Sequence, residues 1–430
     1  MSHRKLEVPG FFAEPPPFDI LFEGKRFAAR PGEPLVVTLM AHGRHVLGRS
    51  SKYHRARGAY CGRGHCGRCL ARVDGHPNTR SCLELSHADA KVESQHVMGS
   101  AKHDLLGARD WMFPQGLDHH TLMTESTTLN RMAVAAARRL AGHGELPALK
   151  MEADPHEVAQ QSVPVLVIGG GQAGRAAHAV LTRAGVASLL IDAAPDAPTP
   201  ALAGARAVGL YDDRDVLVLK EGRLIRVQAE VCVLATGAME PAPTCDGNDA
   251  PGLITRRLCE QALRLGVRPG RRIVMATQTN ADDDTMEAAR TLATSLTHAG
   301  VSIELALNLG ELAVARRSLS GQLAALAGRG RVQRVQLVDE DETFEADAVV
   351  WCPAPVPDYA LARQMGIATP FDATRGAFVP VCEQDGRTSR PGVLLAGEII
   401  GLGAHAAEEH GRRVGETALT LLPGTAGAHP

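Results

Sequence analysis

The chain has 430 residues, and its 46 Lys and Arg nearly balance its 48 Asp and Glu to give a formal net charge of −2. This balance argues against a nucleic-acid binder, which usually carries a basic surplus, and against an acidic disordered chain. At roughly 150 residues per domain, the length predicts two to four domains. The 44% of hydrophobic residues are ample for a large core.

No stretch of the sequence reaches the ~18 apolar residues that a membrane-spanning helix needs. The first residues also lack the apolar core of a signal peptide. We therefore expect no membrane span and a cytoplasmic protein with reduced thiols. In that compartment, clustered cysteines are more often metal or cluster ligands than disulfides.

The first predicted elements form a small β-rich module over residues 17–95. Residues 18–28 alternate around Glu23-Gly24, which predicts a hairpin. A short helix is predicted over residues 34–41, and a second hairpin turns at Asp74-Gly75.

Four of the nine cysteines lie in this module, with the spacing Cys61-x4-Cys66-x2-Cys69-x12-Cys82. Three thiolates in one loop and a fourth from a later segment are typical of a plant-type [2Fe–2S] cluster. The glycines between them allow backbone N–H groups to approach the sulfurs. A zinc site and a redox dithiol at Cys66 and Cys69 are the alternatives. However, a zinc site normally uses two separated pairs, and a redox dithiol opens a helix after a strand.

A basic stripe precedes the cysteine loop and consists of Arg49, Lys52, His54, Arg55 and Arg57. It is either an anchor for a flavin phosphate or an acidic partner, or a solvated loop. The sequence does not decide between these interpretations.

Residues 96–160 are less regular and predict a connecting arm, with an Ala-rich helix over residues 129–141. An apolar run from Val163 then leads into glycines, as in a parallel strand that is buried on both faces. With the helix and strand that follow, it makes a βαβ unit, and a second such unit starts at Arg271.

These patterns predict a body of two α/β domains. We assign residues 161–255 and 346–430 to an FAD- or NAD-binding Rossmann domain, and residues 256–345 to a second, degenerate nucleotide-binding-like domain.

The pattern Gly169-x-Gly171-x-x-Gly174 follows the first strand of the body and opens a helix, and Asp192 ends the second strand. In this context the glycines permit a tight turn and the close approach of a pyrophosphate. The helix N-terminus supplies N–H donors, and the carboxylate accepts ribose hydroxyls. The alternative is a turn with incidental glycines.

Two later strands indicate which dinucleotide binds. One ends in Thr236 and Gly237, and the other ends in Gly397 and Glu398. Two-dinucleotide flavoproteins use such segments, the second to hold the ribityl chain and pyrophosphate of FAD, although their acid is usually Asp. We favour FAD, with NAD in the same site as the competitor.

The second βαβ unit has no such glycine loop, which predicts a structural relic or an atypical nucleotide site. No cysteine pair follows the Gly174 helix, which excludes the dithiol–disulfide reductases of this architecture. No catalytic acid–base arrangement stands out, so we assign no catalytic residue. Glu408, Glu409 and His410 are predicted on a C-terminal helix that could line the flavin edge.

The chain resembles the α subunit of heterotetrameric sarcosine oxidase and related bacterial dehydrogenases of hydroxyproline, proline and opines. The resemblance covers residues 18–420. The segments that carry it, besides the four-cysteine loop, are residues 52–58, 78–82, 138–147, 169–174, 234–241, 247–252 and 352–358.

This resemblance implies an α/β fold, with a two-dinucleotide-binding (glutathione-reductase-like) Rossmann body behind an N-terminal β-grasp [2Fe–2S] ferredoxin-like domain. In that family a separate β subunit holds a flavin and oxidises the C–N bond of an amino acid, while the α subunit moves electrons. The resemblance therefore implies such a β subunit as partner. It also leaves room for a further small subunit and for an FMN at a subunit interface.

We expect an electron-transfer subunit of a flavin-dependent dehydrogenase that acts on CH–NH or CH–NH2 donors such as sarcosine, proline, hydroxyproline or an opine. The presence of all four cluster cysteines favours a dehydrogenase over an oxidase. This chain lacks the folate-binding domain of sarcosine oxidase α subunits, so we expect no tetrahydrofolate chemistry. The alternatives are an NAD(P)H-dependent reductase that supplies an oxygenase, and a non-catalytic assembly scaffold.

Overall fold

The computed structural model of the chain divides into two compact units. Unit 1 comprises residues 1–150 and 242–354, and unit 2 comprises residues 151–241 and 355–430. The structure describes residues 18–50, 54–97, 100–101, 127–128, 131–132, 158–195, 197–198, 200–211, 215–338 and 340–423. The arm and its helix, which the sequence predicts between residues 96 and 160, lie largely outside the described residues.

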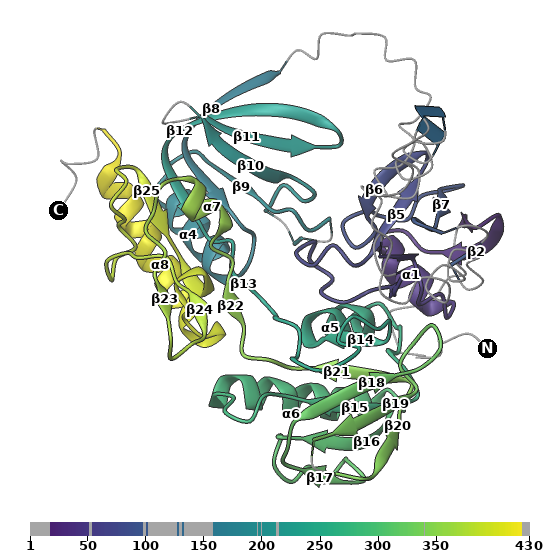
Figure 1. The fold of residues 1–430 in the computed structure, drawn as a ribbon. Coiled ribbons are helices and arrows are strands. Elements are labelled where there is room, and N and C mark those ends of the chain that lie inside the picture. Colours follow the sequence, from purple (N-terminus) through teal and green to yellow (C-terminus); the bar gives the residue numbers. More distant parts are fainter. Residues whose placement is uncertain are drawn as a thin grey trace. The chain divides into compact units, whose positions relative to one another are not determined.

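The N-terminal module of unit 1 is a mixed five-stranded sheet with one helix packed against it (Figure 1). The strand order is β2-β1-β7-β5-β6, in which only β1 and β7 run parallel. The elements are β1 (Phe18–Phe22), β2 (Lys25–Ala29), α1 (Leu35–Ala41), β3 (Gly48–Arg49), β4 (Ala56–Arg57), β5 (Leu70–Val73), β6 (His76–Arg80) and β7 (Lys91–Glu93). This arrangement confirms the predicted β-grasp module.

Both predicted hairpins form, and their turns explain why. Glu23 and Gly24 have φ of 50° and 74°, and Asp74 and Gly75 have φ of 49° and 83°. Two successive residues with positive φ make the turn that matches the twist of a two-residue hairpin. An acid or amide followed by glycine is the sequence that tolerates this turn, so the two turns could be predicted.

The second part of unit 1 is a parallel sheet with the strand order β14-β21-β15-β16-β17, accompanied by a three-stranded antiparallel sheet. All four residues of β21 and the last four of β15 are buried, as expected for strands that are covered on both faces. The elements are β14 (Leu253–Thr255), α5 (Arg256–Arg264), β15 (Arg272–Ala276), α6 (Asp283–His298), β16 (Ser302–Leu307), β17 (Ser318–Leu319), β18 (Leu323–Ala327), β19 (Arg334–Leu337), β20 (Thr343–Glu345) and β21 (Ala348–Trp351).

Two segments at the edges of this second part are grouped differently by the sequence pattern and by the structure. The pattern groups residues 242–255 and 346–354 with the first Rossmann domain, whereas the structure has both in unit 1. The reason is strand pairing, because β21 lies between β14 and β15 in the parallel sheet of unit 1.

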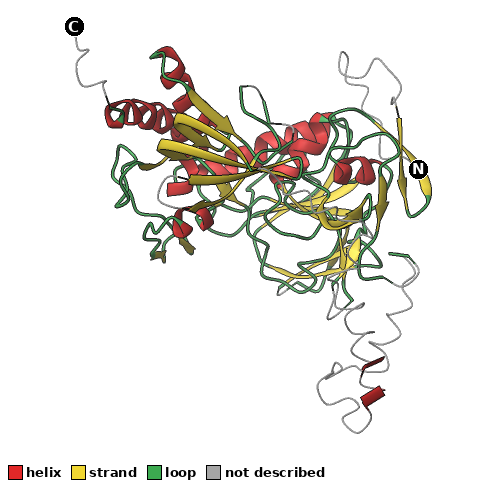
Figure 2. Ribbon diagram, turned by 90° about the horizontal axis from the view of Figure 1, so that it is seen from above, coloured by secondary structure: helices red, strands yellow, loops and turns green. Residues whose placement is uncertain are grey.

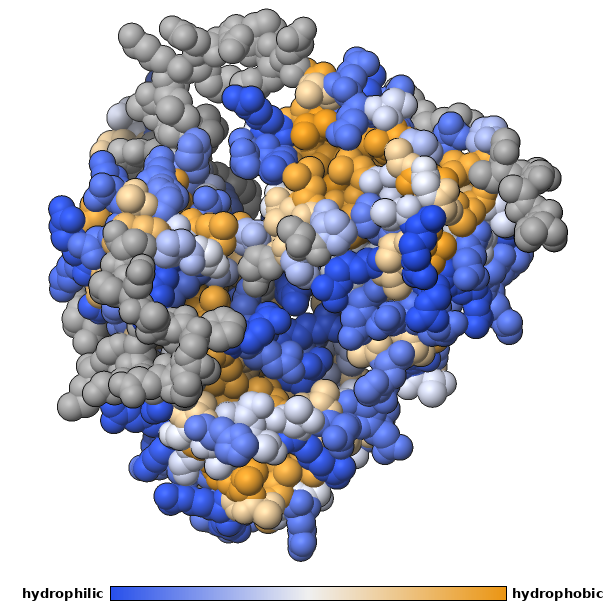
Figure 3. Space-filling model, turned by 180° about the vertical axis from the view of Figure 1, so that it is seen from behind, coloured by the Kyte–Doolittle hydropathy of each residue, from blue (hydrophilic) through white to orange (hydrophobic). Residues whose placement is uncertain are grey.

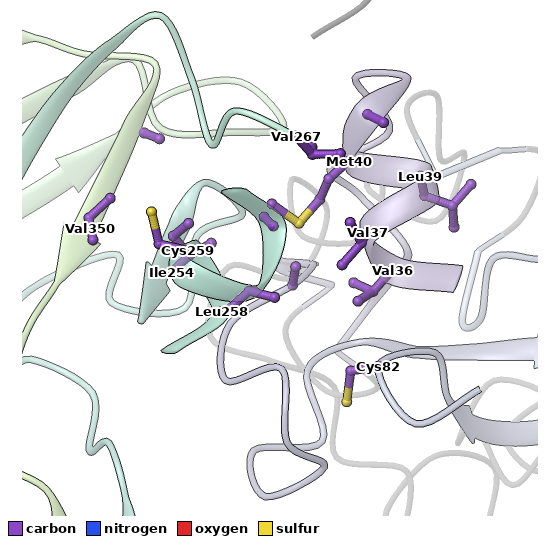
Figure 4. Packing of buried hydrophobic residues seen from close by; sticks show 14 of the residues in the cluster. Val36, Val37, Leu39, Met40, Cys82, Ile254, Leu258, Cys259, Val267 and Val350 are labelled. Atoms are coloured by element: carbon purple, nitrogen blue, oxygen red, sulfur yellow. The ribbon is translucent and has the colours of Figure 1, made fainter. Parts of the chain in front are cut away.

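The two parts of unit 1 share one hydrophobic core. All seven residues of α1 are buried, and the six apolar ones belong to the same cluster as Ile254, Leu258 and Val267 from the second part. Figure 4 shows Met40 of α1 and Val267 close together, and Leu258 of α5 facing the same helix. The N-terminal module is therefore packed onto the second part of unit 1 rather than tethered to it.

Unit 2 contains the first βαβ unit, and its six-stranded sheet has the order β10-β11-β12-β8-β9 with β25 also paired to β12. Strand β12 pairs in parallel with β8 on one side and, at its carboxyl end, with β25 on the other. The elements are β8 (Ala159–Ile168), α4 (Gln172–Arg183), β9 (Ser188–Ile191), β10 (Arg206–Tyr211), β11 (Asp215–Lys220), β12 (Arg223–Leu234), β13 (Ala238–Met239), β22 (Val356–Pro357), α7 (Ala360–Gln364), β23 (Phe371–Asp372), β24 (Ala377–Phe378), β25 (Val393–Leu395), η1 (Gly397–Ile400) and α8 (Ala404–Leu421).

The helices α4 and α8 pack against each other at very close range. A Cβ at Gly411 would lie 2.2 Å from the carbonyl oxygen of Ala173, and a Cβ at Gly415 would lie 2.9 Å from that of Ala177. Glycines on α8 therefore let the two backbones touch. This contact holds the start of α4, which follows the glycine loop, against the C-terminal helix.

Strands make up most of the regular structure in the described residues (Figure 2). Hydrophilic side chains dominate the face seen in Figure 3, and apolar side chains gather there in separate patches. Among the described residues, no helix is both long enough and apolar enough to cross a membrane.

Candidate cluster site and dinucleotide site

The four cysteines of the N-terminal module lie together around the loop between β4 and β5. Hydrogen bonds from the side chains of Cys66 and Cys82 lower the pKa of the Cys61 thiol, and a hydrogen bond from Cys82 lowers that of Cys69. These hydrogen bonds link the four side chains in the order Cys66, Cys61, Cys82 and Cys69. Within the described residues, no three or more His, Cys, Asp or Glu side chains are grouped to hold a single metal ion.

Glycines and backbone N–H groups shape this loop around the sulfurs. Gly62, Gly64 and Gly67 have φ of 68°, 78° and 62°, a region that few other residues adopt. The N–H groups of Arg63 and Arg68 each donate to a cysteine sulfur two residues earlier, at 3.5 Å. Such donors stabilise thiolates that are bound to iron, so the loop fits a [2Fe–2S] cluster.

The segment that carries Cys82 is tied to the same loop. The backbone N–H and the hydroxyl of Ser81 both donate to the carbonyl oxygen of Cys69, at 3.2 Å and 2.8 Å. Cys61, Cys69 and Cys82 are 5%, 2% and 1% exposed, whereas Cys66 is only half-buried. The cluster site therefore has one open edge, at Cys66.

The cysteine loop packs against the second part of unit 1, and we call its contacting residues Asn248, Asp249 and Thr255 the seat. The N–H of Thr255 donates to the carbonyl oxygen of Tyr60 at 3.0 Å. The guanidinium of Arg68 lies over the Tyr60 ring, 4.1 Å from its centroid, and donates to the carbonyl oxygen of Asn248 at 2.7 Å. Asp249 pairs with Arg57 at 3.3 Å.

Our interpretation of the sequence missed the residues of this seat. The segment 247–252 carries part of the family resemblance, but its role could not be inferred, because Asn248 and Arg68 lie 180 positions apart in the chain. The sequence signal for these residues is the family-like motif at residues 247–252. The basic residue Arg57 was named as part of the stripe, and the structure gives it an acidic partner from the seat.

The glycine loop of unit 2 connects β8 to α4, and its three glycines serve different purposes. Gly169 has φ of 112°, and a Cβ there would lie 2.1 Å from the carbonyl oxygen of Ala235. A Cβ at Gly174 would lie 1.8 Å from the carbonyl oxygen of Gly169. By contrast, a Cβ at Gly171 would have no atom within 4 Å. Two glycines are required by the fold, and the third borders open space at the helix N-terminus.

Asp192 directly follows β9 and stabilises this loop by two hydrogen bonds. One carboxylate oxygen accepts from the N–H of Gly170 at 2.6 Å, and the other accepts from the N–H of Ala194 at 2.7 Å. Each carboxylate oxygen can accept a second hydrogen bond. The side chain is therefore compatible with ribose hydroxyls as further donors.

The predicted residues after β12 and β25 lie at the same end of the sheet as the glycine loop. The Thr236 hydroxyl donates to the carbonyl oxygen of Asp358 at 2.9 Å. Gly237 has φ of 76°, and a Cβ there would lie 3.5 Å from a Glu398 carboxylate oxygen. A Cβ at Gly397 would lie 2.5 Å from the Cβ of Ala173 at the start of α4. The eight predicted dinucleotide-site residues thus gather at the carboxyl edge of one sheet, which fits a bound dinucleotide.

His410 of α8 also belongs to this region, although it makes a structural contact. The N–H of Gly397 donates to its Nδ1 at 3.1 Å, and the side chain is buried. Burial is the main cause that lowers the pKa of His410 below its ordinary value. Glu408 and Glu409, its predicted companions, are exposed.

In the second βαβ unit, the N-terminus of α6 differs from the glycine loop before α4. Asp282 caps α6 by accepting from the N–H of Thr285 at 2.8 Å, and Asp283 and Asp284 follow in the first turn. A helix N-terminus attracts negative charge, and here three carboxylates already supply it. This arrangement disfavours a pyrophosphate at that position.

Comparisons with known proteins support these assignments. Residues 16–97 match the family described as 2Fe-2S iron-sulfur cluster binding domain, which confirms the predicted cofactor of the N-terminal module. Its four ligands remain a prediction. A further match is the hydrogen cyanide synthase subunit HcnA of Pseudomonas aeruginosa, 36% identical over 76 residues, which are 18% of this chain and 72% of that protein.

Two longer matches are α subunits of sarcosine oxidase. The protein from Rhizobium meliloti is 28% identical over 358 residues, which cover 70% of this chain and 35% of the relative. The protein from Corynebacterium sp. is 25% identical over 419 residues, which cover 84% of this chain and 37% of the relative. The chain thus spans about a third of the length of these two relatives.

Among solved structures, the L-proline dehydrogenase from P. horikoshii has the same fold, with a TM-score of 0.66 and 20% identity over 94% of this chain and 73% of that one. The fold and the sites define a two-dinucleotide-binding Rossmann protein with an N-terminal [2Fe–2S] ferredoxin-type domain. More narrowly, the chain is similar over most of its length to the α subunits of sarcosine oxidase.

Proposed function

We propose that this chain is the electron-transfer subunit of a heteromeric, flavin-dependent dehydrogenase of amines or amino acids. The observation that carries the proposal is the convergence of four thiols on one loop, in the same chain as a glycine-loop dinucleotide site. The relatives that are named as sarcosine oxidase α subunits and as L-proline dehydrogenase support a substrate with a CH–NH or CH–NH2 group.

The cluster is proposed to be held by Cys61, Cys66, Cys69 and Cys82. The N–H groups of Arg63 and Arg68 are positioned to stabilise the negative charge of the sulfurs, and burial of three of the thiols excludes water from most of the site. When bound, a [2Fe–2S] cluster supplies the transfer of one electron at a time.

The dinucleotide site of unit 2 is proposed to hold FAD, with NAD as the competing occupant. Gly171 leaves room for the pyrophosphate, and the N-terminus of α4 offers N–H donors to it. Asp192 would orient the ribose, while Thr236, Gly237, Gly397 and Glu398 would border the ribityl chain. A bound flavin would supply hydride acceptance and the release of single electrons.

The substrate is proposed to be oxidised on a flavin-containing β subunit, because no catalytic acid–base arrangement was assigned to this chain. A further small subunit and an FMN at a subunit interface belong to the same proposal and rest on the family resemblance. The proposed location is the cytoplasm. The second part of unit 1 is proposed to serve mainly as the seat of the cluster module.

Co-purification tests this proposal. A tag on this chain should bring down a flavin-containing partner from the source cells, and mass spectrometry should identify FAD or NAD among the cofactors released from the complex. Recovery of the chain alone, with its cluster and with NAD(P)H-dependent reduction of that cluster, would favour the reductase alternative instead.

A further inference from the structure

The open edge of the cluster site borders a small cavity. A cavity of about 320 Å³ is lined by Cys66 and Gly67 together with Arg49, Arg57 and Arg68. Ser50, Gln95 and His96 complete its polar lining, and its described lining contains no acidic side chain. Because the other three thiols are buried, this is the edge at which the cluster site comes nearest to the surface.

The chain around this edge is strongly basic although the whole protein is not. Between Glu33 and Asp74 the sequence contains eight Lys and Arg and no Asp or Glu, whereas the whole chain has a net charge of −2. We call Arg49, Arg55, Arg57, Arg63 and Arg68 the basic face. Arg55 and Arg63 are exposed on it, and Arg63 lies within the cysteine loop.

Within the described part of the chain, Asp249 is an acidic residue that pairs with the basic face. Asp249 lies 3.3 Å from Arg57 and 3.8 Å from Arg55, and its side chain is 13% exposed. The guanidinium of Arg49 donates to the carbonyl oxygens of His54 and Ala101, which orient it at this edge. Arg63 adds an exposed cation within the cysteine loop, so the described residues of the basic face include more cations than this carboxylate pairs with.

We propose that the basic face is the docking surface for an acidic one-electron carrier protein, which exchanges electrons with the cluster across the Cys66 edge. The inference rests on the proposed function, because it requires the cluster. One electron passes from the reduced cluster to the carrier, so the cluster is oxidised and the carrier is reduced by one electron, and no proton moves. Complementary charge favours this occupant, since electrostatic attraction raises the rate of encounter.

Stopped-flow oxidation of the full-length protein, reduced with dithionite, tests the charge at this edge. The probes are two small oxidants of opposite charge, ferricyanide and tris(phenanthroline)cobalt(III). We expect ferricyanide to oxidise the cluster faster, with an advantage that shrinks as salt is added. Arg63→Gln and Arg55→Gln should each lower the ferricyanide rate about two- to fivefold. Arg334→Gln, an exposed charge on β19, is the matched control and should leave the rate unchanged.

Calorimetry with purified flavodoxin, an acidic carrier, provides a readout that does not depend on turnover. Salt-sensitive binding that is weakened by Arg63→Gln but not by Arg334→Gln supports the docking surface. Equal rates with the two oxidants, or flavodoxin binding unchanged in Arg63→Gln, would overturn it. Loss of bound FMN in Arg57→Gln would assign the cavity to a flavin phosphate and would also overturn it. A protein without iron would refute the proposed function itself, so the two failures are distinguishable.

Discussion

The nine cysteines of this chain fall into two groups that differ in their surroundings. Four converge on one loop, where glycines and backbone N–H groups face the sulfurs. The five others lie apart from that loop, and in Cys232, Cys245 and Cys382 burial raises the pKa of the thiol. The four cysteines are proposed as ligands from their spacing alone, because a cluster dictates the spacing of its ligands.

The substitution Cys69→Ser should abolish the cluster. Cys69 is 2% exposed and is held by Ser81, so a serine there would present a hydroxyl where iron requires a thiolate. The purified variant should lose the brown colour and the two irons expected per chain. Cys245→Ser, a half-buried cysteine outside the loop, is the control and should keep both. Full iron content in Cys69→Ser would remove this residue from the ligand set.

The thiol of Cys245 should react slowly with iodoacetamide at neutral pH. Burial, and then the negative charge of Asp246, raise its pKa to about 11. A raised pKa means that the thiolate forms only at higher pH, so the alkylation rate should climb about tenfold per pH unit between about pH 8 and about pH 10. Protein unfolded in urea is the control and should level off near pH ~9. A plateau in the folded protein near that pH would contradict the raised pKa.

The glycine loop allows a prediction that separates binding from folding. Gly171→Val places a side chain in open space at the helix N-terminus, so it should remove the bound nucleotide, while the melting temperature of the nucleotide-free protein should stay nearly unchanged. Gly174→Ala should instead destabilise unit 2, because its Cβ would lie 1.8 Å from a carbonyl oxygen. Cofactor release and thermal unfolding measure the two effects. Unchanged nucleotide content in Gly171→Val would refute the assignment of this site.

Local elements of the fold could be predicted from the sequence, whereas pairings between distant segments could not. The hairpin turns at residues 23–24 and 74–75 are local and were predicted correctly, as was the strand that precedes the glycine loop. The partners of β21 could not be predicted, because a short apolar strand fits either parallel sheet equally well. The seat of the cluster loop was missed for the same reason, since it depends on contacts between distant parts of the chain.

The shared core of unit 1 predicts that the cluster module and its seat unfold together. Leu258 is fully buried, and its side chain lies within 3.3 Å of where a Cβ on Gly62 would be. Leu258→Ala should cost about 2–5 kcal/mol of unfolding free energy. It should also lower the denaturant concentration at which the visible absorbance of the cluster is lost.

A matched deletion provides the control for this prediction. Leu181→Ala removes an equally buried leucine from the core of unit 2, so it should destabilise that unit and leave the cluster transition in place. If Leu258→Ala left the bleaching of the cluster unchanged while it destabilised the rest of unit 1, the module would be an independent domain.

At the scale of the whole molecule, one chain carries both the cysteine loop and the glycine loop, and the proposed role as an electron-transfer subunit rests on this combination. The chain is similar in sequence to sarcosine oxidase α subunits and has the same fold as a proline dehydrogenase. Its sequence revealed the fold class through local patterns, and the same patterns predict both sites. It did not reveal the substrate, because no pattern for substrate chemistry was found in this chain.

The most direct test of the proposed function is electron paramagnetic resonance of the purified complex under anaerobic conditions. Adding sarcosine, proline, hydroxyproline or an opine, each in turn, should produce the signal of a reduced [2Fe–2S] cluster with one of these substrates, and Cys69→Ser should remove that signal. A cluster that remains oxidised with every amino acid but is reduced by NADPH would contradict the account.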